Sequence, residues 1–307
     1  MKDTSPADPI DRRNAMKKAA VFSDIHSNYI AFSACVDDAL VSGASAFVFL
    51  GDFVTDFPDA RKTLDLIYRL KSEYPCMIIR GNRERYLLEA RQGKISLSRG
   101  TKTGSWLYNY EQLTESDLDL FESLPFYREA ELFGIELELA HALRDNDRFF
   151  YEKGDKHIDG VASQMKYKYL LTGHSHKQYI YTVGGKTIIN PGSVGVARGV
   201  KGKAHYALLN IENGEIIPIL REVGYDLSAV IHRHFESGFV DCAKYWAIGI
   251  LYDIITGDEI AVKLLEKMLD YCGGDRTMLD NESLWQEIAS SSGLKFTERE
   301  ITELANS

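Results

Sequence analysis

The amino-acid sequence predicts an α/β protein in which two sheets form a sandwich that is covered by helices. Strand-like and helix-like runs alternate from Ala19 to Arg91, which is typical of a parallel sheet with right-handed crossover helices. Three glycine-containing turns between residues 126 and 220 are each flanked by short apolar runs, which predicts three hairpins. After Tyr225 the apolar residues recur at helical spacing, so we expect a helical extension to follow the sandwich.

In the first half of the chain, each of three strands is followed by a helix. The second of these helices carries Leu64, Ile67 and Leu70 at the spacing of one helical face. The strands are short apolar runs, as expected of strands that are buried on both faces. The expected strands are Ala19–Phe22, Phe47–Leu50 and Met77–Ile79, and the expected helices are Asn28–Val41, Asp59–Lys71 and Glu84–Arg91.

The second half begins with a short helix and continues with hairpins. Thr114 and Asp117 resemble a capping box before a helix that ends near Leu124. The Asn213-Gly214 pair is the strongest short hairpin signal in the chain. The strands expected beside the three turns are Phe126–Leu132 and Ile135–Ala140, Tyr179–Val183 and Thr187–Ile189, and Ala204–Ile211 and Glu215–Leu220. The run Tyr169–Leu171 is expected to be a single strand, and Glu259–Tyr271 to be a helix.

The pattern divides the chain into three segments: a disordered leader over residues 1–16, a main domain over 17–224 and a helical extension over 225–307. Met16 is an alternative natural start. The leader has no apolar core like that of a secretory signal, and no run is long enough to span a membrane. The net charge of −9 argues against non-specific binding to nucleic acid or to an anionic membrane. We therefore expect a cytoplasmic protein.

Polar side chains follow five of the apolar runs, at the point where each run ends. The carboxyl ends of parallel strands meet at one edge of a sheet, so we expect these side chains to converge there. Carboxylate, amide and imidazole ligands in this number suit a pocket for two divalent cations. The seven side chains are Asp24, His26, Asp52, Asn82, His141, His174 and His176.

Each of these side chains also has a simpler interpretation. Taken alone, Asp24 or Asp52 is often a helix cap, Asn82 a turn residue and His141 a core histidine. The ordered series favours the metal ligands, because every member lies at the end of a strand-like run. A glycine also stands just before the ligand in three of the fragments.

This series resembles the calcineurin-like metallophosphoesterase superfamily, in its small bacterial phosphodiesterase branch. The resemblance covers Lys17 to Glu222 and includes the Asn190–Gly195 turn after the last histidine pair. It implies a four-layer α-β-β-α sandwich of two mixed sheets. It also implies one metal held by Asp24, His26, Asp52 and His176, and a second held by Asp52, Asn82, His141 and His174, with Asp52 as the bridge. Such ligands suit Mn, Fe, Zn, Co or Ni, and no thiolate narrows the choice.

The resemblance implies metal-dependent hydrolysis of phosphoric esters, in which a hydroxide that bridges the metals attacks phosphorus. Arg83 occupies the position at which the superfamily often has histidine as a candidate general acid. Because arginine stays protonated, we expect Arg83 to bind a phosphate oxygen instead; the alternative is that it only begins a surface helix. The residues expected nearest the chemistry are Asp52, Asn82, His141 and Arg83, with Arg80, Arg85 and Arg144 as weaker phosphate-binding candidates.

The lack of a general acid at position 83 affects which substrates can be hydrolysed. A leaving group that is stable as an anion needs no protonation, which favours a phosphodiester or phosphoanhydride, such as a nucleotide or a dinucleoside polyphosphate. The expected partner is therefore a small, nucleotide-like phosphorylated molecule. The alternative is a catalytically weak or inactive scaffold of the same fold that binds other proteins, and the full ligand set favours the enzyme. The helices after residue 225 are a candidate surface for homo-oligomer formation.

Overall fold

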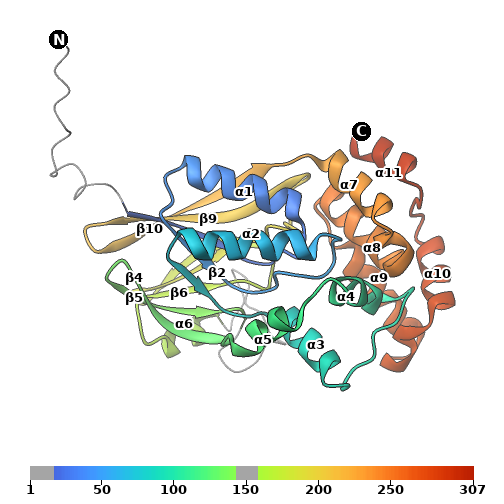
Figure 1. Ribbon diagram of the computed structural model, residues 1–307, viewed down its shortest axis with the longest axis horizontal. Coiled ribbons are helices and arrows are strands. Elements are labelled where there is room, and N and C mark those ends of the chain that lie inside the picture. The colour runs from blue at the N-terminus through green and yellow to red at the C-terminus, as the bar shows by residue number, and fades with distance from the viewer. Residues whose placement is uncertain (1–16, 143–157) are drawn as a thin grey trace, which may run out of the picture.

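The structure is a computed structural model that describes residues 17–142 and 158–307; the predicted leader, residues 1–16, and Arg144 lie outside these ranges. Its strands form two five-stranded sheets, with helices on their outer faces and at one end (Figure 1). The strands are β1 (Lys17–Phe22), β2 (Ala46–Phe49), β3 (Cys76–Ile78), β4 (Tyr127–Leu132), β5 (Ile135–Ala140), β6 (Tyr169–Thr172), β7 (Gln178–Val183), β8 (Lys186–Pro191), β9 (Lys203–Glu212) and β10 (Glu215–Gly224). The helices are α1 (Tyr29–Val41), α2 (Ala60–Glu73), α3 (Asn82–Arg91), α4 (Lys102–Tyr110), α5 (Glu115–Ser123), α6 (Ile158–Gln164), α7 (Leu227–Glu236), α8 (Phe239–Thr256), α9 (Ile260–Tyr271), α10 (Glu282–Ser291) and α11 (Glu298–Ala305), with a 3-10 turn at Arg276–Asp280.

The first sheet has the strand order β10-β9-β1-β2-β3 and is mixed. The strands β1, β2 and β3 are parallel, whereas β9 is antiparallel to β1 and β10 is antiparallel to β9. Alternate side chains of β1 point to opposite faces, so Val21 lies in the core between the sheets and Phe22 in the core under the helices. Parallel pairing places the carboxyl ends of β1, β2 and β3 at one edge of the sheet.

The second sheet has the strand order β4-β5-β6-β8-β7. The central strands β5, β6 and β8 are parallel, and the edge strands β4 and β7 are antiparallel to their neighbours. Its inner face contributes Leu137, Leu139 and Leu171 to a core that also contains Val21 and Val48 of the first sheet. This shared apolar core holds the two sheets face to face.

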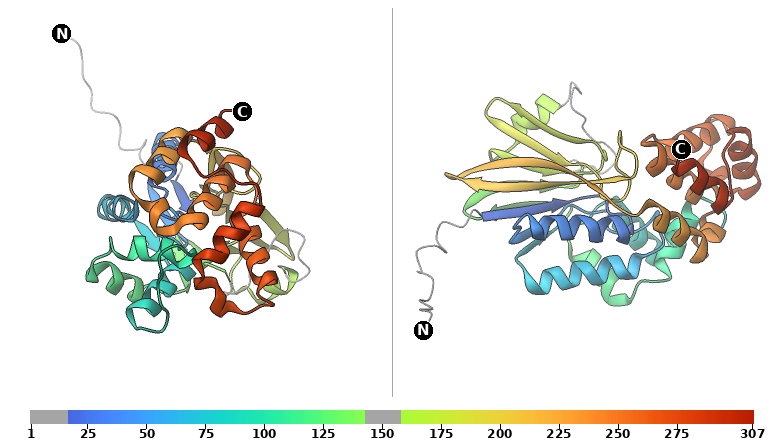
Figure 2. Two further views of the ribbon diagram at one scale, coloured as in Figure 1. Left: turned by 90° about the vertical axis from the view of Figure 1, so that its right-hand side faces the viewer. Right: turned by 90° about the horizontal axis from the view of Figure 1, so that it is seen from above.

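Helices cover both outer faces of this pair of sheets (Figure 2). Phe32 of α1 and Leu64 of α2 share a core with Phe22 on the outer face of the first sheet. Ala162 of α6 packs in a core with Ile188 on the outer face of the second sheet. The predicted four-layer α-β-β-α sandwich of two mixed sheets is therefore confirmed.

The helices α7 to α11 gather at one end of the sandwich (Figure 1). Their core includes Leu251 of α8, Leu264 of α9 and Trp285 of α10. Phe57 and Val196, from loops that follow β2 and β8, belong to the same core. The C-terminal helices are therefore packed on the edge at which the parallel strands end. Within residues 17–142 and 158–307, no helix is long and apolar enough to cross a membrane.

The expected helices and strands are present, with ends shifted by a few residues. Two further helices were not expected, because they carry no strong signal in the sequence. One is α6, and the other is α4, which contains Gly104. A Cβ atom at Gly104 would lie 2.3 Å from the carbonyl oxygen of Cys242 in α8. The close packing of α4 on α8 thus explains a helix that intrinsic propensity does not favour.

Candidate metal centre

The seven predicted side chains converge at the carboxyl ends of the strands. They come from the loops after β1, β2, β5 and β6 and from the first residue of α3. Six of them fall into two groups in which one ligand atom of each residue lies within 4.8 Å of the others: Asp24, His26 and His176, and Asp52, His141 and His174. The two groups adjoin, because His26 Nε2 lies 3.9 Å from Asp52 Oδ2.

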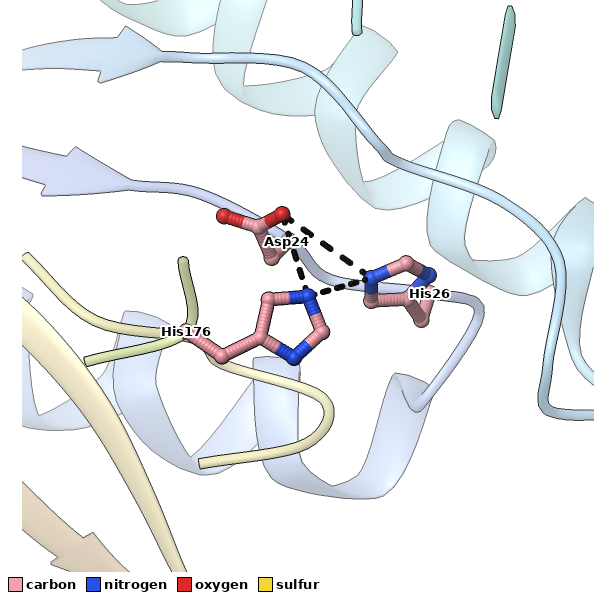
Figure 3. Close-up of side chains that lie close together, drawn as sticks. All are labelled: Asp24, His26 and His176. Atoms are coloured by element: carbon pink, nitrogen blue, oxygen red, sulfur yellow. Dashed lines mark hydrogen bonds and ion pairs between the residues drawn. The ribbon is translucent and has the colours of Figure 1, made fainter. Parts of the chain in front are cut away.

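The first group consists of Asp24, His26 and His176 (Figure 3). The Nε2 atoms of His26 and His176 lie 3.1 Å apart. Asp24 Oδ1 lies 3.3 Å from His176 Nε2 and 3.9 Å from His26 Nε2. The other oxygen of Asp24 accepts from Ser23 Oγ and from the backbone N–H of His174, which fixes the carboxylate. Three donor atoms therefore face one point.

The second group is Asp52, His141 and His174, and Asn82 lies against it. His141 Nε2 lies 3.5 Å from Asp52 Oδ2, 3.1 Å from Asn82 Oδ1 and 3.2 Å from His174 Nδ1. The other oxygen of Asp52 accepts from the backbone N–H of Arg83 at 2.8 Å. Four side chains from four elements thus direct nitrogen or oxygen atoms at a second point.

The hydrogen bonds made by the Nδ1 atoms of His26 and His176 determine which way the lone pairs on their Nε2 atoms point. His176 Nδ1 donates to the carbonyl oxygen of Val196 at 3.1 Å, and His26 Nδ1 faces the carboxylate of Asp56 at 3.2 Å. With both Nδ1 atoms protonated, the two Nε2 atoms present lone pairs to each other. Asp24 Oδ1 is buried and makes no hydrogen bond within the described residues. Such contacts are unfavourable without a cation between them, so these donors fit a divalent metal ion.

The same holds for the second group. His141 Nδ1 donates to the carbonyl oxygen of Leu50 at 2.6 Å, so in the neutral ring Nε2 is an acceptor that faces Asn82 Oδ1 and Asp52 Oδ2. A backbone carbonyl that fixes the histidine tautomer in this way is the usual partner of a metal-bound imidazole. The donor set again fits a divalent cation of the kind that binds nitrogen and oxygen ligands.

The pKa values reflect the crowding of charge. Burial raises the pKa of Asp52, but the neighbouring imidazoles of His141 and His26 lower it below its usual range. Burial lowers the pKa of His141, but the carboxylate of Asp52 raises it above the usual range, so without a cation a proton on His141 meets the charge of Asp52. Burial and the charge of His141 bring the pKa of His174 down to about 3. The carboxylates of Asp24 and Asp52 therefore attract positive charge, which a bound cation supplies.

The ligand loops have an unusual backbone conformation. Five of the seven side chains stand on residues with positive φ, which non-glycine residues seldom adopt. Each such residue costs roughly 1–3 kcal/mol and persists only where its surroundings enforce it. These residues are Asp24, His26, Asp52, His174 and His176, with φ between 53° and 67°. Strain of this kind is typical of a binding site.

Glycines let the ligand loops pack against one another. A Cβ atom at Gly51 would lie 2.2 Å from the backbone nitrogen of Gly81, and one at Gly81 would lie 2.1 Å from Asp52 Oδ1. A Cβ atom at Gly173 would lie 1.9 Å from Ser23 Oγ, beside Asp24. The glycines that precede the ligands in the sequence thus have a physical reason: side chains there would push the ligand loops apart.

Replacing Gly81 with Ala is expected to weaken metal binding by tenfold or more and to lower the free energy of unfolding by about 1–3 kcal/mol. The added methyl group would displace the Asp52 carboxylate, although the backbone of Gly81, with φ of −102°, tolerates alanine. Calorimetric metal titration and chemical denaturation measure the two effects. Gly160→Ala is the control, since a Cβ atom there meets nothing within 4 Å. Unchanged metal affinity in Gly81→Ala would contradict this account.

Glu84 supports the Asp52 loop and had no role in the sequence-based predictions. Its carboxylate accepts from the backbone N–H groups of Gly81, Asp52 and Phe53 at 2.7–2.9 Å. Burial and the charge of Asp52 raise the pKa of Glu84 to about 7, although these three hydrogen bonds lower it. Glu84 thus ties the first turn of α3 to the loop that carries Asp52.

Asp56 and Trp246 were also missed from the sequence. Asp56 Oδ2 accepts from Arg83 Nη2 at 2.8 Å and faces His26 Nδ1, while Asp56 Oδ1 accepts from Trp246 Nε1 at 2.8 Å and from Ser105 Oγ at 3.1 Å. Trp246 packs in the core of the C-terminal helices and also contacts the site. These partners are far apart in the sequence, so no local spacing reveals them.

A pocket of about 180 Å³ opens onto the candidate ligands. Arg83 lines it, with 14% of its side chain exposed, so this residue does not merely begin a surface helix. Arg198 lines it as well, from the glycine-containing loop after β8, and was not predicted. Arg80 donates instead to the carbonyl oxygen of Phe121, and Arg85 pairs with Glu89 on α3.

Comparisons with known proteins agree with this geometry. Residues 16–214 match the family model of the calcineurin-like phosphoesterase superfamily domain. An uncharacterized protein of Methanocaldococcus jannaschii, MJ0912, is 29% identical over 231 residues, which cover 70% of this chain and 90% of that protein.

The solved structures that are similar to this one include two with TM-scores above 0.6. The hypothetical protein PH1004 from Pyrococcus horikoshii OT3 has a TM-score of 0.66 and 19% identity, covering 78% of this chain and 99% of that one. A metallophosphoesterase from Sphaerobacter thermophilus has a TM-score of 0.63 and 19% identity, covering 80% of this chain and 100% of that one. At this identity the two likenesses show a shared fold.

Proposed function

This chain belongs to the calcineurin-like phosphoesterase superfamily, and we propose from that premise that it hydrolyses a small phosphodiester or phosphoanhydride of the nucleotide type. It is a metal-dependent hydrolase of phosphoric esters; the substrate, the metals and the roles of individual residues are the subject of the proposal. The single observation that carries it is the pair of adjoining groups of buried ligand atoms, in which His26 Nε2 lies 3.1 Å from His176 Nε2 and His141 Nε2 lies 3.1 Å from Asn82 Oδ1.

Asp24, His26, Asp52 and His176 would hold one divalent cation, and Asp52, Asn82, His141 and His174 the other, with Asp52 shared. When bound, two such cations activate water as a nucleophile and stabilise charge on the phosphoryl oxygens. The protein contributes the positions of the ligands, through Ser23, Leu50 and Val196, and the pocket above them.

Arg83 would orient the phosphoryl group. Its Nε atom is buried and makes no hydrogen bond within the described residues, and its Nη2 atom is held by Asp56. Burial lowers the pKa of Arg83 but Asp56 raises it, so the guanidinium remains a cation and cannot serve as an acid. A planar guanidinium fits two phosphate oxygens.

The proposal favours leaving groups that are stable as anions. Hydrolysis forms a bond from a water oxygen to phosphorus and breaks the bond from phosphorus to the leaving oxygen, and the protons of the water pass to product or solvent. A nucleotide or aryl oxyanion leaves without a proton donor, whereas an alkoxide needs one. The Arg83 guanidinium offers positive charge for binding but no proton at neutral pH.

The test compares three substrates in the presence of added Mn²⁺ and after chelation. We expect hydrolysis of a dinucleoside tetraphosphate and of an aryl phosphodiester, and slow hydrolysis of an alkyl monophosphate. Chelation is expected to abolish all turnover. A preference for the alkyl monophosphate would defeat the argument from Arg83, and metal-independent turnover would defeat the assignment of the two cation sites.

A further inference from the structure

The pocket above the candidate metal centre is closed on one side by the C-terminal helices. Trp246 and Ile250 of α8 and Val262 of α9 line it together with Asn82 and His174 of the sandwich. A substrate bound at the candidate ligands therefore also meets the extension. The apolar side chains of α8 and α9 form one part of that wall, and Arg198 lies in another, beside the acidic residues Asp253, Asp258 and Glu259.

The loop that carries Arg198 is bonded to both parts of the molecule. The carbonyl oxygen of Val196 accepts from His176 Nδ1 at 3.1 Å, which orients a candidate metal ligand. Two residues of the same loop bind the junction of α8 and α9: Gly199 N–H donates to Gly257 and Gly202 N–H donates to Ile254, both at 2.9 Å. The position of this loop thus depends on the extension.

Arg198 is held in the pocket by an ion pair with the extension. Its Nη1 atom lies 2.7 Å from Oε1 of Glu259, the residue before α9, and only 18% of its side chain is exposed. Arg83 reaches the same pocket from α3 and is held by Asp56. The pocket therefore offers two guanidinium groups, from separate elements, each positioned by a carboxylate.

Two guanidinium groups and a metal centre suit a substrate with more than one anionic group. A guanidinium binds phosphate in the same two-pronged manner as carboxylate, so a phosphate can bind Arg198 beside Glu259, which keeps the guanidinium in position. We propose that Arg198, positioned by Glu259, binds a second phosphate of the substrate, so that the C-terminal helices make the enzyme select phosphoanhydrides over simple phosphodiesters. This inference rests on the proposed hydrolase function and narrows its substrate class.

The test uses Arg198→Lys, which keeps the charge but loses the planar fork, and Glu259→Gln, which keeps the size but loses the ion pair. We expect Arg198→Lys to raise the KM for a dinucleoside tetraphosphate about 10-fold to 100-fold, with kcat little changed. Its kcat/KM for bis(p-nitrophenyl) phosphate, which has one phosphate, is expected to stay within about twofold. Glu259→Gln is also expected to lower the kcat/KM for the tetraphosphate relative to that for the diester, to a smaller extent. Glu266→Gln, on the exposed face of α9, is the matched control.

A binding measurement provides a second readout that does not depend on turnover. By calorimetry, the wild-type protein is expected to bind inorganic diphosphate more tightly than inorganic phosphate, and Arg198→Lys is expected to lose that preference. Equal losses for both substrates, or an unchanged preference for diphosphate, would overturn the role of Arg198 while the hydrolase function stands. If the metal-loaded wild type hydrolyses neither substrate, the proposed function itself fails. Should Glu259→Gln not fold, Arg198→Lys decides the matter alone.

Discussion

Asp52→Asn is expected to lower kcat for metal-dependent hydrolysis by about 10³-fold or more and to remove at least one bound metal. The carboxylate of Asp52 stands between the two donor groups, with Oδ2 3.5 Å from His141 Nε2 and 3.9 Å from His26 Nε2. An amide at this position carries no charge and turns an N–H₂ group toward one of the sites. Loss of several kcal/mol of charge stabilisation in the transition state corresponds to a rate loss of this size.

The fold is expected to survive this substitution. Asp52 Oδ1 accepts from the backbone N–H of Arg83, and the amide oxygen of asparagine can accept the same bond. The melting temperature of the metal-free variant should therefore remain close to that of the wild type. Metal content by elemental analysis and kcat by a continuous assay provide the two measurements.

Asp65→Asn is the matched control, because Asp65 is exposed on α2 and, among the residues that the structure describes, pairs only with Arg61 at the surface. It removes the same charge from a neighbouring element and is expected to change neither metal content nor kcat. If Asp52→Asn retained two metals per chain and wild-type turnover, Asp52 would not be the shared ligand, and the two groups would have to act independently.

The sequence carries enough information to place the strands and the seven candidate ligands. In a sheet of parallel strands, the carboxyl ends lie together whatever the loops do, so an Asp or His directly after a strand is located once the strand is recognised. Asp24, Asp52 and His141 are such residues. The sequence also shows the glycines that precede the ligands. Only the structure shows that Gly51 and Gly81 allow two ligand loops to touch.

The supporting residues were not predictable, because their roles depend on packing between distant segments. Asp56 and Trp246 are 190 residues apart, and their hydrogen bond exists only because α8 packs on the loop after β2. Arg198 and Glu259 meet across the junction of sandwich and extension in the same way. Helix α4 was missed for a related reason, since its close contact with α8 at Gly104 outweighs a weak local signal.

Asp56→Asn is expected to lower the free energy of unfolding by about 3 kcal/mol and to weaken metal binding by about 10-fold to 100-fold. Asp56 is 1% exposed and is the close carboxylate partner of Arg83, so its loss leaves a largely buried guanidinium with only the more distant carboxylate of Asp52, 3.9 Å from Arg83 Nε. Donors face both oxygens of Asp56, so the N–H₂ group of asparagine must meet one of them, which weakens the contact that orients His26 Nδ1. Chemical denaturation of the metal-free protein isolates the first effect, and metal titration measures the second.

A double-variant cycle with Arg83→Met separates the ion pair from other roles of Asp56. If the cost of Asp56→Asn arises from an unpaired cation, the double variant should be less destabilised than the sum of the two single variants, by about 1–3 kcal/mol. Metal affinity should not recover in the double variant, because Asp56 acts on His26 and not through Arg83. Additive stability changes would show that Asp56 and Arg83 are energetically independent. A recovery of metal affinity would place the effect on the charge of Arg83 instead of on the orientation of His26.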